Sequence, residues 1–281
     1  MDSSAVENVI KDAIQKQITS LNLSHRQIVI VPMNLKDATT LKRLQLNDNK
    51  IIMPPDEIGH LPNLEELSLD NNRLTVLPSN IFLLKNLTYL NISKNPVGAL
   101  PSAIGNLVSL VQLWVMETEL ENFPKEIGKL KQLEKLGAQS NRIMELPETF
   151  GELSCLQWLH LADNRLQSLP ESFGKLQALV SLNLDSNRFL SIPDCLSELR
   201  MLTSLSVKGN DINDLSDDII LGLVHLTKLD MRDTNILLRK EHWKVWTTNN
   251  HCCYLSNNNI ISFIKMLLLL TMTSMKITLA V

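Results

Sequence analysis

Six residues in the middle of the chain have the composition of a protein-binding surface. Tryptophan and tyrosine rings bury a large apolar area, and they attract arginine as well as apolar side chains. Aromatic residues make up only 4% of the 281 residues, yet two of the four tryptophans belong to this group. The six candidates are Tyr89, Trp114, Met116, Gly137, Trp158 and His160.

Residue patterns that would indicate catalysis are absent from the sequence. It contains no Gly-x-Gly-x-x-Gly, Gly-x-x-x-x-Gly-Lys-Ser/Thr, His-Glu-x-x-His or Gly-x-Ser-x-Gly motif. The six histidines fall at different positions of the repeat described below, so they cannot converge on one metal ion. Acidic pairs such as Glu65-Glu66 are expected on an open sheet face, where solvent prevents the desolvation that tunes a catalytic carboxylate. We therefore predict no enzymatic activity and no cofactor.

A repeating unit rich in leucine must position the candidates. The stretch Leu64-Glu-Glu-Leu67-Ser-Leu69-Asp-Asn-Asn72-Arg-Leu74 recurs every 23 residues, with one step of 24 at the end. Its ten copies start at Ile18, Leu41, Leu64, Leu87, Leu110, Leu133, Leu156, Leu179, Leu202 and Leu226. No unit can bury its leucines alone, so the copies must stack.

Each unit predicts a short strand followed by a helical turn. Leu67 and Leu69 alternate with polar residues at period two, so the fourth and sixth positions point into the core. Stacked strands then form one parallel sheet on the concave side of a curved solenoid. The segment Leu100-Pro101-Ser-Ala-Ile104-Gly105 predicts a convex helical turn with proline in its first position and a glycine where the chain reverses.

Asparagine occupies the ninth position of most units, as at Asn72 and Asn95. Backbone groups lose their ladder partners where the strand turns inward, and a carboxamide offers both a donor and an acceptor to satisfy them. We therefore interpret these asparagines as structural rather than as a binding row. Thr118 and Thr234 interrupt the series, and Arg26 replaces the asparagine of the first unit.

The pattern Leu-x-x-Leu-x-Leu-x-x-Asn-x-Leu resembles the leucine-rich repeat, and the match covers about four fifths of the chain. The fold class that this implies is α/β, a horseshoe-shaped repeat solenoid. The 23-residue unit with Leu-Pro-x-x-Ile-Gly-x-Leu is similar to the intracellular Ras-group repeats of plants and of Scribble, Erbin and Ras-suppressor scaffolds. This resemblance implies an adaptor or scaffold in the cytoplasm, with a protein partner connected in some cases to small-GTPase signalling.

The candidates share the face that the repeat leaves free. Third and fifth positions point outward from each strand, and most of them are small or polar. Trp114 and Trp158 lie two strands apart, or about 10 Å, with Gly137 between Trp114 and His160. This spacing predicts an open notch with an aromatic rim, which would accept an apolar side chain or an arginine of the partner.

The repeats divide the chain into three parts. Residues 1–17 are expected to form a helix that caps the N-terminal end, because Val6, Ile10 and Ala13 share one helical face. Residues 18–248 hold the ten units. Residues 249–281 are expected to be a decayed eleventh unit or a C-terminal cap or tail. A membrane anchor in this apolar tail stays an alternative, although its longest uncharged run falls short of the roughly 20 residues of a membrane span.

The charge balance argues against partners that bind through charge alone. The formal net charge is −3, so no global basic field would attract nucleic acid or an anionic membrane. The N-terminus lacks the pattern of a signal peptide, and Cys155, Cys195, Cys252 and Cys253 lack the spacing of a disulfide framework. We expect a cytoplasmic monomer. The alternatives are a regulatory or substrate-recognition subunit of a phosphatase or ubiquitin ligase, and a membrane-tethered repeat protein.

Overall fold

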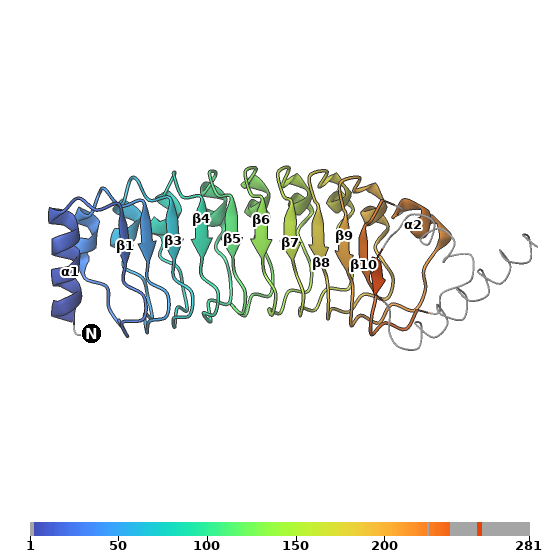
Figure 1. The fold of residues 1–281 in the computed structure, drawn as a ribbon, viewed down its shortest axis with the longest axis horizontal. Helices are drawn as coiled ribbons and strands as arrows, with labels where there is room; N and C mark the ends of the chain where they lie inside the picture. The colour runs from blue at the N-terminus through green and yellow to red at the C-terminus, as the bar shows by residue number, and fades with distance from the viewer. Residues whose placement is uncertain (1–2, 224, 237–251, 255–281) are drawn as a thin grey trace, which may run out of the picture.

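The strands of successive units stack into one parallel sheet that runs along a gently curved solenoid (Figure 1). The computed structural model describes residues 3–223, 225–236 and 252–254. The sheet contains eleven strands in chain order. They are β1 (Ser20–Asn22), β2 (Arg43–Gln45), β3 (Glu66–Ser68), β4 (Tyr89–Asn91), β5 (Gln112–Trp114), β6 (Lys135–Gly137), β7 (Trp158–His160), β8 (Ser181–Asn183), β9 (Ser204–Ser206), β10 (Lys228–Asp230) and β11 (Cys252–Tyr254). The predicted α/β solenoid with a parallel sheet is confirmed.

The core follows directly from the leucine pattern. The central residue of each strand from β1 to β10 is a buried leucine, and Leu67 of β3 lies in register with Leu44 and Leu90 of its neighbours. Leu69, at the sixth position, is also fully buried. One unbroken hydrophobic core therefore runs through the stack, and each unit contributes the same few positions to it.

The asparagine row is structural, as predicted. Asn72 donates hydrogen bonds from Nδ2 to the carbonyl oxygens of Leu46 and Leu69, both at 2.9 Å. Its Oδ1 accepts a hydrogen bond from the backbone N–H of Ile51 at 3.0 Å. Leu46 and Ile51 belong to the preceding unit, so each asparagine connects neighbouring units from inside the turn. At Thr118 the hydroxyl replaces the amide and donates to the carbonyl of Val115 at 2.8 Å.

Short 3-10 helices form the convex side. They are η1 (Met33–Asp37), η2 (Asp56–His60), η3 (Ser79–Leu83), η4 (Ser102–Asn106), η5 (Lys125–Lys129), η6 (Glu148–Glu152), η7 (Glu171–Lys175) and η8 (Asp194–Glu198). Pro101 precedes η4 in an extended conformation, with φ −72° and ψ 156°, so it is not the first helical residue that the sequence predicted. Its carbonyl accepts the backbone N–H of Ile104 at 3.0 Å and starts the turn.

The glycine of this segment serves packing rather than chain reversal. A Cβ on Gly105 would lie 2.7 Å from the carbonyl oxygen of Glu126 in the next unit. Real Cβ atoms do not approach backbone oxygens so closely, because the repulsion is severe. The glycine therefore lets consecutive convex turns stack, which corrects the predicted reason for its presence.

Two α-helices differ from the regular series of strands and 3-10 helices. The helix α1 (Ser3–Gln15) covers the N-terminal end of the core, with Val6 and Ile10 buried against it (Figure 1). In the unit that begins at Leu202, Ser216 stands in place of the proline, and α2 (Asp217–Gly222) replaces the 3-10 helix. At the other end, β11 pairs with β10 and places Cys253 opposite Leu229. Most of the segment 249–281 lies outside the described residues.

Candidate binding surface on the sheet

Strands β4 to β7 carry five of the six candidates on outward positions. Register places Trp114 of β5 opposite Gly137 of β6, and Gly137 opposite His160 of β7. Trp158 stands opposite Lys135 in the same three strands. The two tryptophans therefore lie diagonally across β6, one at each end of a strand, and both are half-buried.

The notch predicted over Gly137 is closed. The ring centroids of Trp114 and Trp158 are 5.5 Å apart with an angle of 51° between the planes, rather than separated by the strand spacing. A Cβ on Gly137 would lie 2.5 Å from Cε3 of Trp114, which shows that the indole lies directly over the glycine. The prediction of an open notch is wrong, because an aromatic ring beside a residue without a side chain gains contact by leaning over it.

His160 completes a small cluster of rings. Its centroid is 5.5 Å from that of Trp158, with the planes nearly perpendicular at 87°, a favourable edge-to-face geometry. Burial lowers the pKa of His160 below its usual value, and the negative charge of Asp185 only partly opposes this. The imidazole is therefore neutral at pH 7. We call Trp114, Gly137, Trp158 and His160 the aromatic patch.

Two buried polar atoms beside the patch have no hydrogen-bond partner within the part of the chain that the structure describes. They are Nε1 of Trp114 and Oε1 of Gln139. The amide nitrogen of Gln139 donates to the sulfur of Met116 on the neighbouring unit, which joins Met116 to this group. An unsatisfied buried donor or acceptor costs about 1–3 kcal/mol, so the closed arrangement carries a polar deficit that a bound partner can remove.

Tyr89 lies apart from the rings, on the N-terminal side of the patch. Desolvation raises the pKa of its hydroxyl most strongly, and the charges of Asp70 and Glu66 raise it further. The pKa of Asp70 is itself raised by burial and by the charge of Asp48. No ring contact to Tyr89 is found among the described residues, so the structure brings five of the six candidates together and leaves Tyr89 on an acidic flank.

Gln139 is the residue that the sequence prediction missed. It follows β6 at the outward seventh position, where most units carry polar residues of no evident role. Two signals were present: Met116 occupies the same position one unit earlier, and Gly137 stands two residues before Gln139. Because the seventh residues of consecutive units lie next to each other, this spacing places Gln139 beside Met116.

A family model described as a leucine-rich repeat region matches residues 25–141 and 125–265. The chain belongs to the leucine-rich repeat family. Repeat domains of this family generally bind proteins and are typically non-catalytic.

Several solved structures resemble this leucine-rich repeat chain. A leucine-rich repeat protein of Leptospira interrogans is 32% identical, with a TM-score of 0.83, over 88% of this chain and 62% of its own length. The functional domain of InlJ from Listeria monocytogenes is 21% identical, with a TM-score of 0.63, over 85% and 53%. The plant peptide hormone receptor RGFR1 in complex with RGF2 is 28% identical, with a TM-score of 0.60, over 85% and 44%. No curated protein matches the chain.

These relatives are bacterial and plant leucine-rich repeat proteins, and each is longer than this chain. They support the repeat family as a whole. They lend no specific support to the predicted resemblance to the Ras-group repeats of Scribble and Erbin.

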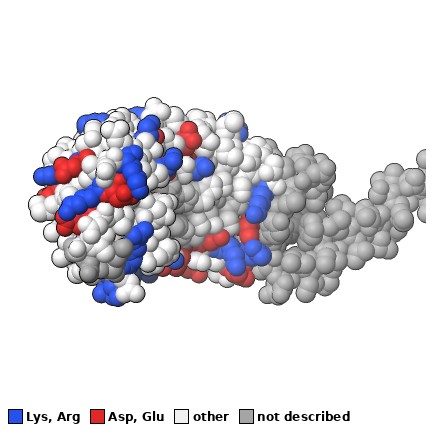
Figure 2. Space-filling model, turned by 60° about the vertical axis from the view of Figure 1, so that its left-hand side comes forward, with Lys and Arg blue, Asp and Glu red and all other residues white. Residues whose placement is uncertain are grey.

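Charges on the leucine-rich repeat sheet neutralise one another between neighbouring strands. Lys42 and Glu65 form a salt bridge of 2.8 Å across adjacent units. Basic and acidic side chains lie side by side at the N-terminal end, without a continuous stripe of either sign on the face in view (Figure 2). At the other end, Arg232 binds Asp230 at 2.6 Å. These ion pairs offset opposite charges locally, and exposed pairs of this kind contribute little to stability.

Other chemistry is sparse in the described parts of the chain. Within them, no group of three histidine, cysteine or acidic residues could hold a metal ion. Cys155 and Cys195 are free thiols, and burial raises the pKa of Cys195 to about 11, which keeps it protonated and unreactive. The described helices include none that is both long and apolar enough to cross a membrane.

Proposed function

We propose that this leucine-rich repeat chain binds a segment of a partner protein on its concave face, at the aromatic patch. The observation that carries the proposal is the indole of Trp114, which covers Gly137 while its own N–H is buried without a hydrogen-bond partner among the described residues. The repeat imposes neither feature, because the equivalent outward positions of other units are mostly small or polar.

Binding requires the Trp114 indole to turn away from Gly137. This movement uncovers the space over the glycine between Trp114 and His160, which stand on either side of it in the sheet register. It also releases Nε1 to donate a hydrogen bond to a carbonyl of the partner and frees Oε1 of Gln139 to accept one. The buried polar deficit of the free protein thereby becomes a contribution to affinity.

The partner side chain that fits this space is apolar or an arginine. Trp158 and His160 present two perpendicular rings, which contact an aliphatic group equally well or stack with a guanidinium. Because His160 is neutral at pH 7, it does not repel a cation there. The similar plant receptor RGFR1 in complex with RGF2 supports a peptide segment as the occupant, since a solenoid of related sequence forms a complex with a peptide hormone.

Our proposal for the cellular setting of this interaction rests only on the sequence of the repeat. The resemblance to Ras-group repeats makes a cytoplasmic adaptor or scaffold, acting as a monomer, our proposal for its cellular role. A small GTPase or one of its regulators is the proposed partner class on the same ground. Nothing in the described residues favours a phosphatase or ubiquitin-ligase subunit. We therefore propose no second function.

Affinity capture tests the proposal. The intact chain and a Trp114→Ala/Trp158→Ala variant are used as baits in parallel, and bound proteins are quantified by mass spectrometry. We expect at least one specific partner to be reduced tenfold or more with the variant, which corresponds to about 1.4 kcal/mol. If every specific partner binds the variant as well as the intact chain, the aromatic patch is not the binding surface.

Leu190→Ala provides the matched control. Leu190 is a large exposed apolar residue outside the sheet strands, so its truncation removes exposed apolar surface without touching the patch. Thermal melting of all three baits must agree within a few degrees. The control bait should retain the partners that the double variant loses.

A further inference from the structure

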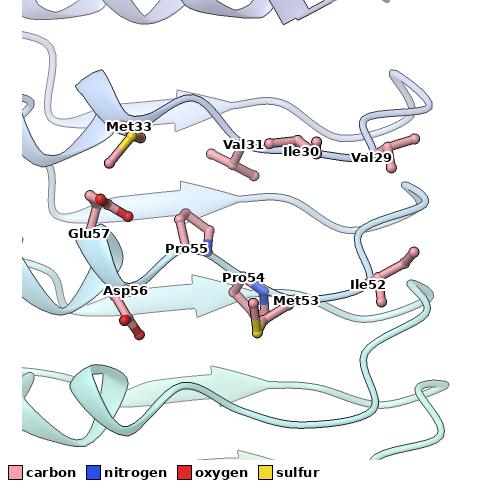
Figure 3. Close-up of a pocket in the computed structure, with 10 residues that line it drawn as sticks. All are labelled: Val29, Ile30, Val31, Met33, Ile52, Met53, Pro54, Pro55, Asp56 and Glu57. Atoms are coloured by element: carbon pink, nitrogen blue, oxygen red, sulfur yellow. The ribbon is translucent and has the colours of Figure 1, made fainter.

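A second apolar surface lies on the convex side, far from the aromatic patch. Between η1 and η2, the first two units enclose a hollow of about 620 Å³, which we call the convex groove (Figure 3). Its walls are two consecutive rows of the chain that run from the turn after each strand to the next 3-10 helix. The apolar residues that line it include Val29, Ile30, Met33, Ile52, Met53 and Pro54.

Five of these six side chains are exposed, and Pro54 is buried beneath them. Ile30 is 71% exposed and Met53 is 64% exposed, and Val29, Met33 and Ile52 are also exposed. Single exposed apolar residues are normal on a protein surface, but neighbouring units that repeat them form a contiguous patch. The row continues into the third unit at Val76, which is exposed as well.

The fold does not require apolar residues at these positions. Later units carry polar pairs there, such as Glu121-Asn122 and Asn213-Asp214, on the same backbone course. The exposed Met144 and Leu190 of other units each stand beside a polar residue, Glu145 or Ser191. The apolar pair is therefore a local property of the first two units and not a consequence of the repeat.

The size of the convex groove fits a linear segment rather than a second copy of the chain. Its volume falls within the roughly 300–1,000 Å³ of pockets that enclose a small ligand or a few side chains. A stable dimer buries about 800 Å² on each partner, which two short rows cannot supply.

One end of the convex groove is acidic. Asp56 and Glu57 begin η2 and line the hollow beside Met33, and no lysine or arginine lines it (Figure 3). Neither carboxylate forms a salt bridge with any residue in the described ranges. A cationic side chain of a bound segment would pair with them at the helix end, while apolar side chains fill the space between Ile30 and Met53.

We propose that the convex groove docks a short linear segment of a partner protein that carries large apolar residues and a nearby lysine or arginine. The apolar side chains lie between the rows of Ile30 and Met53, and the cation lies at Asp56 and Glu57. This surface is independent of the aromatic patch, so one molecule of the chain can bind two segments at once.

A random dodecapeptide library displayed on phage and selected against the intact chain tests the proposal. Enriched peptides are synthesised with a fluorophore, and their affinity is measured by anisotropy. We expect a consensus of two or more large apolar residues with a nearby lysine or arginine. Ile30→Glu/Met53→Glu should weaken binding at least about tenfold, and Asp56→Asn/Glu57→Gln should weaken it less while reducing its salt dependence.

Matched variants separate the possible outcomes. Leu190→Glu places a single glutamate at a similarly exposed apolar site, at 63% exposure, and should leave the affinity unchanged, whereas Ile30→Glu and Met53→Glu made singly should each weaken it. Trp114→Ala/Trp158→Ala should also leave it unchanged, which distinguishes this surface from the aromatic patch. The proposal is overturned if the library yields no binder that depends on Ile30 and Met53, or if the consensus is acidic. It is also overturned if sedimentation shows self-association that Ile30→Glu/Met53→Glu abolishes.

Discussion

Two aromatic pairs lie on opposite sides of the leucine core and differ in burial and in ring geometry. Phe150 and Phe173 are buried on the convex side, 23 residues apart, with ring centroids 6.2 Å apart and planes inclined by only 7°. Trp114 and Trp158 are half-buried on the sheet, with centroids 5.5 Å apart and planes inclined by 51°.

The difference shows which contacts the repeat dictates. Phe150 and Phe173 occupy the same position of consecutive units, so the stacking of the units alone makes their rings parallel. Trp114 and Trp158 occupy different positions of units two apart, and no repetition of the unit would bring them together. The phenylalanine pair therefore stabilises the stack of units. The stacking of units does not explain the tryptophan pair, which fits a role in binding.

Phe150→Ala should have the largest effect on stability. It empties a fully buried site between Phe123 and Phe173, and a change of this kind costs about 3–5 kcal/mol. Urea denaturation followed by circular dichroism measures it. Phe150→Leu is the control, with a smaller loss expected, and a stability loss for Phe150→Ala below that of Trp114→Ala would overturn the contrast between the pairs.

Leu159→Ala sharpens the contrast within one strand. Leu159 is buried in the core between two patch residues, so its truncation should cost about 2–5 kcal/mol. Trp158→Ala beside it should cost roughly 1 kcal/mol, the size of a partly exposed ring contact. Denaturation of both variants under identical conditions gives the comparison, and equal losses would show that Trp158 is part of the core.

Gly137→Ala should move the Trp114 indole with little loss of stability. The new methyl group would meet the ring at 2.5 Å, so the indole must turn outward. We expect a red shift of tryptophan fluorescence and stronger quenching by iodide, with a loss of stability of about 1 kcal/mol. Gly137→Ala in a Trp114→Phe background isolates the response of Trp114. An unchanged spectrum would mean that the ring does not rest on the glycine.

His160→Gln should have the smallest effect, visible only as a change in pH dependence. The folded-state pKa of His160 is lowered by burial, so below about pH 6.5 the unfolded chain binds more protons than the folded chain. The contribution of the neutral imidazole is thus complete at high pH and is lost as the pH falls. Stability measured at pH 7.5 and 5.5 should decline less for His160→Gln than for the intact chain, and an equal decline would contradict the burial of the imidazole.

The fold could be predicted from the sequence because the same pattern of leucine and asparagine recurs in each unit. Alternation at Leu67 and Leu69 predicted the strand and its buried face, and the carboxamide of Asn72 predicted hydrogen bonds to the backbone inside the turn. Gly105 was misinterpreted because its role depends on the distance to Glu126 in the next unit. That distance is a property of the stack, and a single unit does not contain it.

The candidate site was predictable in its residues and not in its shape. Strand spacing fixes where the backbones of β5 and β7 lie, but it does not fix the side-chain torsions that bring Trp114 over Gly137. The convex groove was not predicted from the sequence, for a different reason. Its signal, Val29-Ile30 followed 23 residues later by Ile52-Met53, lies in positions where the repeat gives no expectation, and only a comparison with later units shows that it is unusual.

Thr118 alters how the units are joined. Asn95 reaches the carbonyl of Leu69 in the unit before it, at 3.0 Å, whereas the hydroxyl of Thr118 binds only within its own unit and to Asn141. The backbone N–H of Val97, whose equivalents bind an asparagine of the next unit, turns instead to Asn95 at 2.8 Å.

The interface between the units that begin at Leu87 and Leu110 thus lacks the asparagine bonds that join most neighbouring units, and the backbone N–H of Met116 donates to Oγ of Ser93 across it at 3.2 Å. In a one-dimensional stack the weakest interface sets where cooperative unfolding divides. We expect two folding blocks that meet at this seam, and β5, with Trp114, is the first strand of the second block. Local opening at the seam would therefore give the chain a point of flexure directly beside the aromatic patch.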